Sequence, residues 1–492
     1  MADPTEATEA MDSFIADYYE QLAAEDAASY EPVELQRRAL HHRELARVRT
    51  PGTVLIDIAA ADNASVVYLV TDDMPFLVDS VNAELVRQQA AIRLVIHPMF
   101  VVARDRGSHE LASVSRVPAH LGVASGDTAA MPARPHLAAA GDNVAAMESW
   151  IAIEIDRVTD EQRDELRRGL AKILKDVRAA VEDWQPMRQQ ALSRARLLAE
   201  VTGSEDITDL REAEDLLQWM DAGNFTFLGY REYDLVRDHD EDVLVTREGS
   251  GLGLLRDAKD KDAKEYKHFQ HLTDTGRAKA REKRALVITK ANSRSTVHRA
   301  AYLDYIGIKS FDAQGNVNGE QRFIGLFASV VYTGSVRNIP VVRQKVDAVL
   351  RHFGFPPDSH SGKDLFAVLE TYPRDELFQI EVADLIATAQ GILRLQERRR
   401  TRLFLRPDIY GRFMSALVYV PRDRYTTAVR RRIEGELTRT FNAESIDFEA
   451  RMSESALARL FFRIRLPRGA HLREVDAAGL EQRLVMAARS WS

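Results

Sequence analysis

The sequence predicts an α+β protein in which one strand–helix–strand–strand unit occurs twice, on either side of a further α+β module. The first copy spans about residues 65–185 and the second about 412–492. In both, an apolar strand is followed by a charged turn and then by a helix. Because a repeated supersecondary unit is better evidence than either copy alone, this repeat carries the prediction. The change of hydrophobic period from helical spacing to alternation supports it.

Composition and charge exclude several classes of protein and of functional site. The 492 residues suffice for about two to four domains. The formal net charge is -8 with both signs interspersed, which argues against a general nucleic-acid binder. The chain has no cysteine, so disulfides, thiolate metal sites and cysteine nucleophiles are excluded. We see neither a signal peptide nor an apolar run of about 18 residues, and therefore expect a cytoplasmic protein with no membrane partner.

The first 48 residues are expected to form a helical region. Phe14 and Tyr18 recur at helical spacing in "MDSFIADYYEQLAAED". His41 and His42 are adjacent and would point about 100° apart on a helix, which makes them a poor pair of metal ligands. We expect both of them on a solvated helix.

Residues 49–186 contain the first copy. Two strand-like runs, "TVLIDIAA" and "SVVYLVT", precede the helical pattern "FLVDSVNAELVRQQA". The strand runs "IRLVIHPMFVVARD" and "SWIAIEIDRV" follow, separated by a loop at about 117–145. An amphipathic helix then begins after Thr159, with Gln162 as the second member of a capping box. This order is a split βαβ pattern, which predicts a ferredoxin-like fold with antiparallel pairing.

The remainder divides into three parts. A helical connector is expected at 187–222, and an α+β module with flanking helices at 223–401. A charged segment at about 256–284 is predicted to leave that module as a surface excursion. The second copy, 402–492, has the strand "FMSALVYVP", the helix "TTAVRRRIEGELTRTF" and the strands "SIDFEARMS" and "ARLFFRIRLP". Its last residues start another helix, so we expect a chain truncated inside that helix.

Two stretches invite an enzymatic interpretation. "EGSGLGLL" carries Gly249, Gly251 and Gly253, but this is G-x-G-x-G and no helix pattern follows, so a hairpin turn fits better than a dinucleotide loop. "SHSGKDLFAVLETYPRDELF" gathers the residue types of a hydrolase: Ser359, His360, Ser361, Lys363, Asp375 and Glu376. The structural alternative, which we favour, is that a residue near Ser361 caps one helix and Pro373 starts the next.

Asp72 and Asp73 lie at the junction between a predicted strand and a predicted helix, in "YLVTDDMPFLVDSVNAELV". No histidine or third carboxylate lies at ligand spacing, which argues against a metal site. Two interpretations remain open. The acids cap the helix, whose N-terminus carries partial positive charge, or the turn holds an amino acid. In the second case an acid binds the ammonium group, and backbone N–H groups around Pro75 and Phe76 bind the carboxylate.

"VTDDMPFLVDSV" also resembles the strand–turn–helix entry of ACT regulatory domains, in which an acidic residue, Pro and often Gly precede the helix. Asp73, Pro75 and Leu77 match that pattern, while Phe76 stands where those domains often have Gly. In the second copy Asp423 takes the acidic position, and Tyr425-Thr426 replaces Pro-Gly. The resemblance implies an effector site at Asp72, Asp73, Pro75 and Phe76.

Four segments in order resemble the N-terminal part of the large bacterial NAD-specific glutamate dehydrogenases: "VTDDMPFLVDSVN", "NFTFLGYREYDL", "LETYPRDELFQI" and "RTRLFLRPDIYGRFMSALVYVPRDRYTT". This resemblance implies ACT-like domains flanking a PAS-like domain, and a homo-oligomer that is tetrameric in the family. It also implies oxidative deamination of L-glutamate with NAD, by a region C-terminal to the part matched here. We therefore expect NAD in the parent enzyme, no cofactor on this segment, and no catalytic residue within it.

The sequence thus leaves two main functions. The first is a regulatory and assembly segment with an amino-acid effector, and the second is a purely architectural module whose pockets are filled by side chains such as Phe76. An independent hydrolase that uses His360 and Ser361 is a third class, which ranks below both.

Overall fold

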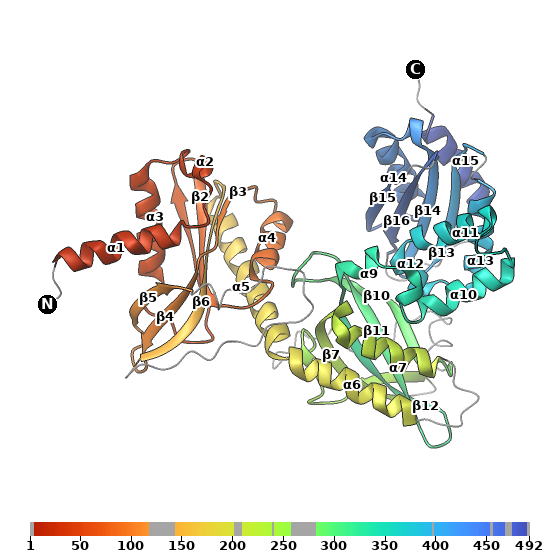
Figure 1. Ribbon diagram of the computed structural model, residues 1–492, viewed down its shortest axis with the longest axis horizontal. Helices are drawn as coiled ribbons and strands as arrows, with labels where there is room; N and C mark the ends of the chain where they lie inside the picture. The colour runs from red at the N-terminus through yellow and green to blue at the C-terminus, as the bar shows by residue number, and fades with distance from the viewer. Residues whose placement is uncertain are drawn as a thin grey trace. The chain divides into compact units, whose positions relative to one another are not determined.

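The computed structural model describes residues 4–117, 143–200, 209–238, 241–256, 282–395, 398–452, 456–467 and 475–489 (Figure 1). It divides into two compact units. The first contains Met1–Gln185 together with Arg294–Ala301, and the second contains Pro186–Ser293 and Tyr302–Ser492. Most of the predicted loop at 117–145 and of the predicted charged excursion at 256–284 lies outside the described residues, as do the last residues of the chain.

The first unit is built on one antiparallel sheet with the order β1-β2-β6-β4-β5, in which β3 also pairs with β6. Its strands are β1 (Leu55–Ala61), β2 (Ala64–Asp72), β3 (Ile92–Ile96), β4 (Met99–Asp105), β5 (Leu111–Arg116) and β6 (Asn143–Asp156). The predicted strand run at 92–105 is interrupted at His97-Pro98, as expected of a proline that cannot donate to a ladder. The long strand β6 therefore pairs with β3 and β4 in turn.

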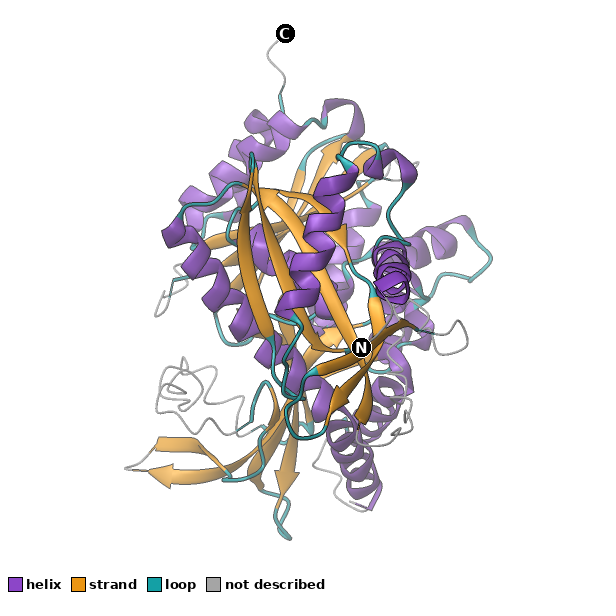
Figure 2. Cartoon of the chain, turned by 90° about the vertical axis from the view of Figure 1, so that its left-hand side faces the viewer, coloured by secondary structure: helices purple, strands orange, loops and turns teal. Residues whose placement is uncertain are grey.

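Helices cover both faces of this sheet (Figures 1 and 2). One face carries α1 (Pro4–Tyr18) and α3 (Pro32–Leu45), with the short α2 (Ala24–Ala27) between them in the chain; the other carries α4 (Leu77–Arg87) and α5 (Asp160–Glu182). Alternate residues of β2, Val66, Tyr68 and Val70, pack with the α1–α3 side. On the other face, a Cβ at Gly169 would lie 2.0 Å from Glu84 Oε1, so glycine allows α5 to pass close to α4.

Two local predictions for this unit can be compared with the structure. The capping box is confirmed, because Thr159 accepts from Gln162 N and Gln162 accepts from Thr159 N. The prediction that His42 lies on a solvated helix is wrong, since its side chain is fully buried. Its Nε2–H donates to Leu69 O at 3.1 Å, which leaves Nδ1 to accept from the Tyr18 hydroxyl at 2.8 Å. Burial lowers the pKa of His42 to about 3, so the ring is neutral.

The second unit begins with α6 (Trp184–Glu200), most of which it contains, and a central sheet of order β10-β11-β12-β7-β8, with β9 also paired to β7. Its strands are β7 (Phe225–Asp238), β8 (Glu241–Thr246), β9 (Leu252–Gly253), β10 (Leu286–Arg294), β11 (Tyr302–Phe311) and β12 (Val317–Phe327). The first half of "EGSGLGLL" lies in the turn after β8, and Leu252–Gly253 within it is β9; β8 and β9 both pair with β7. A turn is therefore present, as predicted, although β8 and β9 do not form a hairpin with each other.

Helices make up most of the remainder of the second unit. They are α7 (Leu210–Trp219), the π-helical turn η2 (Met220–Asn224), α9 (Ser329–Thr333), the 3-10 turn η5 (Val336–Asn338), α10 (Val342–Phe353), α11 (His360–Thr371), α12 (Arg374–Gln379) and α13 (Val382–Leu393). The predicted helix starts are close to those observed. Ser359 caps α11 by accepting from Gly362 N, and Pro373 precedes α12.

A second antiparallel sheet completes this unit, in the order β13-β14-β16-β15. Its elements are β13 (Arg402–Pro407), β14 (Phe413–Pro421), the 3-10 turn η6 (Arg422–Arg424), α14 (Thr427–Phe441), β15 (Ser445–Arg451), β16 (Leu457–Arg465) and α15 (Ala477–Ala487). Its order is that of β1-β2-β6-β3 in the first unit, so the predicted repeat is present in the topology as well as in the sequence. The edge strand β15 carries Asp447, Glu449 and Arg451 on one face and a half-exposed Phe448 on the other.

Among the helices of the described residues, we find none with both the length and the apolar character needed to cross a membrane.

Candidate functional site

The turn after β2 separates its two acidic residues. Asp72 is the last residue of β2 and lies opposite Glu148 of β6, and Asp73 N continues the ladder by donating to Met147 O at 3.0 Å. Because successive side chains of a strand point to opposite faces, the two carboxylates enter different environments.

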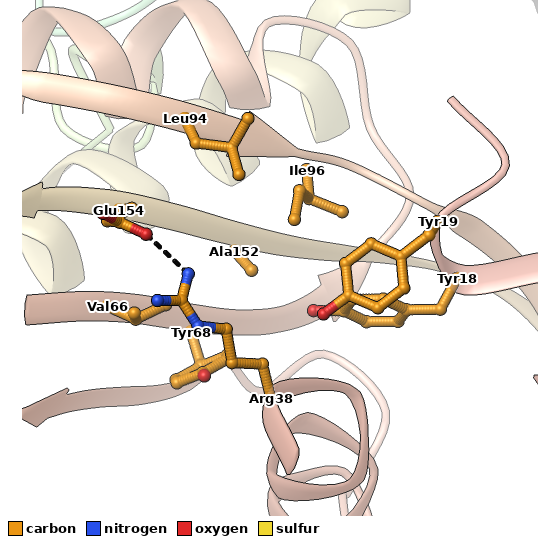
Figure 3. Close-up of a pocket in the computed structure, with 9 residues that line it drawn as sticks. All are labelled: Tyr18, Tyr19, Arg38, Val66, Tyr68, Leu94, Ile96, Ala152 and Glu154. Atoms are coloured by element: carbon orange, nitrogen blue, oxygen red, sulfur yellow. Dashed lines mark hydrogen bonds and ion pairs between the residues drawn. The ribbon is translucent and has the colours of Figure 1, made fainter. Parts of the chain in front are cut away.

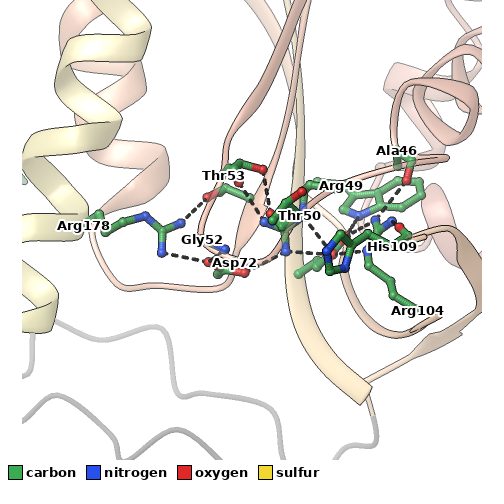
Figure 4. A network of polar contacts seen from close by, with 12 residues as sticks. Ala46, Arg49, Thr50, Gly52, Thr53, Asp72, Arg104, His109 and Arg178 are labelled. Atoms are coloured by element: carbon green, nitrogen blue, oxygen red, sulfur yellow. Dashed lines mark hydrogen bonds and ion pairs between the residues drawn. The ribbon is translucent and has the colours of Figure 1, made fainter. Parts of the chain in front are cut away.

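Asp72 lies between two arginines (Figure 4). Its Oδ1 accepts from Arg49 Nη2 at 2.7 Å, and its Oδ2 lies 2.8 Å from Arg178 Nη1 and accepts from Gly52 N at 3.1 Å. Burial acts to raise the pKa of Asp72, but the charges and hydrogen bonds of Arg49 and Arg178 outweigh it, so the pKa lies below its usual value. This side chain is therefore ionised and committed to the fold.

Behind Asp72, a fully buried carboxylate holds the arginine side chains in place. Glu148 accepts hydrogen bonds from Arg49 Nε and Nη2, from Arg104 Nε and Nη2, and from Trp150 Nε1 at 3.1 Å. Both arginines are almost completely buried. Since an isolated charge is costly in the interior, the arrangement is stable only while Glu148 and Asp72 balance the guanidinium groups.

Asp73 belongs to a second chain of hydrogen bonds. The Ser149 hydroxyl donates to Asp73 Oδ1 at 2.6 Å, and His97 Nε2 lies 3.1 Å from the same hydroxyl oxygen. Because the hydroxyl has one hydrogen, Nε2 of His97 must be the donor. Burial lowers the pKa of His97 despite the nearby Asp73, so the imidazole is neutral. Within the described residues, Asp73 Oδ2 accepts no hydrogen bond.

Helix α4 begins without a side-chain cap, so the interpretation of Asp72 and Asp73 as helix caps is wrong. Phe76 occupies the N-cap position with φ 70, in the left-handed region. This conformation costs a non-glycine residue roughly 1–2 kcal/mol, and it explains why related turns often use Gly. The N–H groups of the first turn of α4 have no intrahelical partner. They and Asp73 could bind a carboxylate and an ammonium group respectively.

The second copy of the turn is built differently. Asp423 lies exposed in η6, and Thr426 is the N-cap of α14, where its hydroxyl accepts from Val429 N at 3.2 Å. The N-terminal turn of α14 is thus capped by its own chain.

The hydrolase candidates do not come together. His360 is 93% exposed, and its Nε2 lies 3.3 Å from Asp364. Ser359 donates to Pro356 O and caps α11, and no hydrogen bond joins His360 to either neighbouring serine in the described residues. Asp375 and Glu376 are held in ion pairs. No group of three or more metal-ligating side chains is found in the part of the chain that the structure describes.

Sequence reasoning missed a small pocket between α1, α3 and the first sheet (Figure 3). It has about 220 Å³ of empty space, part of it open to solvent, and is lined by Tyr18, Tyr19, Arg38, Val66, Tyr68, Leu94, Ile96, Ala152 and Glu154. Its charges are already paired, since Arg38 donates to Glu154 at 2.5 Å and to Glu34 at 2.7 Å. The lining comes from five segments far apart in the chain, and no local pattern could have indicated it.

Three family models match in order: the ACT1 domain of glutamate dehydrogenase over residues 14–170, its helical motif 1 over 339–398 and its ACT2 domain over 402–492. The two ferredoxin-like sheets are thus those of ACT domains, which defines the class of protein. The ACT1 match includes most of the N-terminal helices that cover the first sheet.

The chain belongs to the NAD-specific glutamate dehydrogenase family. It is 39% identical over 424 residues to the NAD-specific glutamate dehydrogenase of Halomonas elongata, covering 85% of this chain and 25% of that protein. It is 37% identical to the NAD-specific glutamate dehydrogenase of Pseudomonas aeruginosa, covering 85% of this chain and 24% of that protein. It is 30% identical to that of Mycobacterium tuberculosis, covering 94% of this chain and 27% of that protein. The chain spans about a quarter of the length of these curated relatives.

Replacing the buried carboxylate tests the charge balance of the first unit. We expect Glu148→Gln to lower the free energy of unfolding by about 3–5 kcal/mol, because it leaves a buried guanidinium group without its counter-charge. Glu110→Gln is the matched control, since Glu110 is 56% exposed in its ion pair with Arg47 and should contribute about 1 kcal/mol or less. Urea unfolding followed by tryptophan fluorescence measures both; equal effects would contradict this account.

Protonation of Asp72 at low pH should weaken its ion pairs with Arg49 and Arg178 and so destabilise the fold. A carboxylate whose pKa is lowered in the folded state stabilises the fold above its unfolded pKa, and this stability is lost as the pH falls through the folded value. We expect Asp72→Asn to destabilise the protein at neutral pH, and the difference from the unmodified protein to shrink below about pH 4. Denaturant unfolding across this range measures it, with the exposed Asp156→Asn as control. A difference independent of pH would refute the assignment.

Proposed function

We propose that this chain is the N-terminal regulatory and assembly segment of an NAD-dependent glutamate dehydrogenase. The ordered match to the ACT1, helical motif 1 and ACT2 models carries this proposal. The parent polypeptide would convert L-glutamate, NAD and water to 2-oxoglutarate, ammonium and NADH, as the names of its relatives indicate. Its catalytic region and NAD site would lie outside this chain, in a cytoplasmic homotetramer, and we expect the 492-residue chain alone to be inactive.

The proposed organisation has five parts, with a PAS-like module in the middle. The parts are a helical region (1–48), an ACT-like domain (49–186), a connector (187–222), the PAS-like module with its flanking helices (223–401) and a second ACT-like domain (402–492). The order of the central sheet supports the assignment of one middle module. Strands β10, β11, β12, β7 and β8 form one sheet in that order, as a single α+β module with five main strands requires.

The proposed effector is an amino acid bound at the turn between β2 and α4. Asp73 would bind its ammonium group through Oδ2, and the first turn of α4, after Pro75 and Phe76, would bind its carboxylate. Asp72 would act indirectly, because its ion pairs with Arg49 and Arg178 fix the end of β2. A ligand that prefers one arrangement of the subunits would then shift their equilibrium by its differential affinity.

The alternative is a purely architectural module. The observation that favours it is the Phe76 side chain, whose ring packs against His298 at a centroid distance of 5.0 Å. ACT-like sheets would in that case serve subunit contacts alone. The two functions differ in whether the protein responds to a small molecule.

Thermal melting of the chain against the twenty amino acids, NAD and 2-oxoglutarate separates them. A ligand at 100 times its dissociation constant should add about 2.7 kcal/mol, which raises the melting temperature by a few degrees. We expect one amino acid to produce this shift and Asp73→Ala to abolish it, because the ammonium group loses its counter-charge. Asp423→Ala, at the corresponding turn of the second copy, is the matched control and should keep the shift. A panel without a response would favour the architectural alternative.

A further inference from the structure

The first unit contains one short segment from a distant part of the chain. Residues Arg294–Ala301, which we call the strap, join β10 to β11, yet they pack with the first unit. Val297 is fully buried there. Within the strap, Ser295 N donates to Ala301 O at 2.8 Å, and the Ser295 hydroxyl donates to Val297 O at 2.7 Å. The strap is therefore a structured turn with a buried apolar anchor.

The strap is bonded to the beginning of α4 through Ser80. His298 N donates to the Ser80 hydroxyl oxygen at 2.9 Å, and that hydroxyl donates to Phe76 O at 2.6 Å. Ser80 is almost completely buried, and both bonds are at least partly buried. A single side chain thus joins the strap to the N-cap residue of α4.

His298 makes two further contacts with the same turn. Its Nδ1 lies 3.1 Å from Asp79 Oδ2, and its ring packs against Phe76 at 5.0 Å. Both His298 and Phe76 have φ 70, a conformation that bulky residues rarely adopt. Such strain persists only where the surroundings impose it, and it concentrates at clamps and switches. The two strained residues face each other across this contact.

A second anchor holds the strap to α5. The Thr296 hydroxyl donates to Asp176 Oδ2 at 2.8 Å. The strap therefore touches both helices on this face of the sheet, and its α4 contacts fall on Phe76, Asp79 and Ser80. These residues flank the N–H groups that would receive the effector carboxylate.

We propose that the strap is a closed cover over the first turn of α4, and that an amino-acid effector binds at this turn by displacing it. The inference rests on the proposed function, since it assigns a regulatory element to the same site. Ligand and strap use one turn, so each weakens the binding of the other. The apparent affinity for the effector is reduced by the fraction of molecules in which the strap is open. Opening releases Arg294–Ala301 from its contacts with α4 and α5.

Hydrogen exchange of the intact 492-residue chain tests the closed state. The strap amides, His298 N–H among them, should exchange slowly in the unmodified protein. Ser80→Ala removes the acceptor of that N–H and should speed exchange in the strap by about tenfold, the loss expected for one buried hydrogen bond. Ser65→Ala is the matched control, because Ser65 is equally buried and accepts from Val158 N at 3.3 Å. It should leave the strap unchanged, and Thr296→Val, which removes the other anchor, should act as Ser80→Ala does.

The effector arm uses the amino acid that raises the melting temperature. Faster strap exchange at saturating ligand, together with tighter ligand binding by Ser80→Ala, supports displacement. A ligand that shifts melting through Asp73 but leaves strap exchange unchanged or slower overturns the strap proposal, while the effector site stands. A strap that exchanges at the rate of an unfolded peptide in the unmodified protein also overturns it. A panel in which no amino acid shifts melting overturns both proposals.

Discussion

The neutralisation of two buried guanidinium groups by Glu148 is the constraint on which the first unit depends. Arg49 and Arg104 both donate hydrogen bonds to this carboxylate, and Nη2 of Arg49 also donates to Asp72. Asp72 is thereby fixed at the end of β2, and the alternation of the strand turns Asp73 to the opposite face. The turn is thus shaped by charge balance several residues away, and of these two aspartates only Asp73 has, within the described residues, a carboxylate oxygen that accepts no hydrogen bond.

The second unit uses the same principle in α12, where Arg374 and Glu376 are buried and Asp375 between them is 12% exposed. Arg374 donates to backbone carbonyls of Val331 and Gly334, while Asp375 and Glu376 each receive cations from other elements. These partners are Lys290 of β10, Arg406 of β13 and Arg463 of β16. This short helix therefore ties the central sheet to the C-terminal sheet within one unit. Asp375 and Glu376, which the sequence offered as hydrolase candidates, therefore have a structural role in these ion pairs.

Sequence patterns indicated what is local and missed what depends on distant partners. The capping box at Thr159 and the repeated order of strands and helices follow from short-range spacing, and both are present. His42 was misplaced because its partners, Tyr18 and Leu69 O, are 24 and 27 residues away. The contact of Phe76 with His298 joins residues more than two hundred positions apart, and nothing near "DDMPF" could have indicated it.

The charged edge strand β15 has a consequence for aggregation. An open strand edge offers unpaired backbone groups to any extended peptide, which is a route to aggregation during synthesis. Asp447, Glu449 and Arg451 place charges on this edge, and Arg430 lies 4.1 Å over the ring of the half-exposed Phe448. Indiscriminate pairing is therefore penalised, whereas a strand with complementary charges is still accepted. The charges on β15 thus lower the risk of aggregation through this edge.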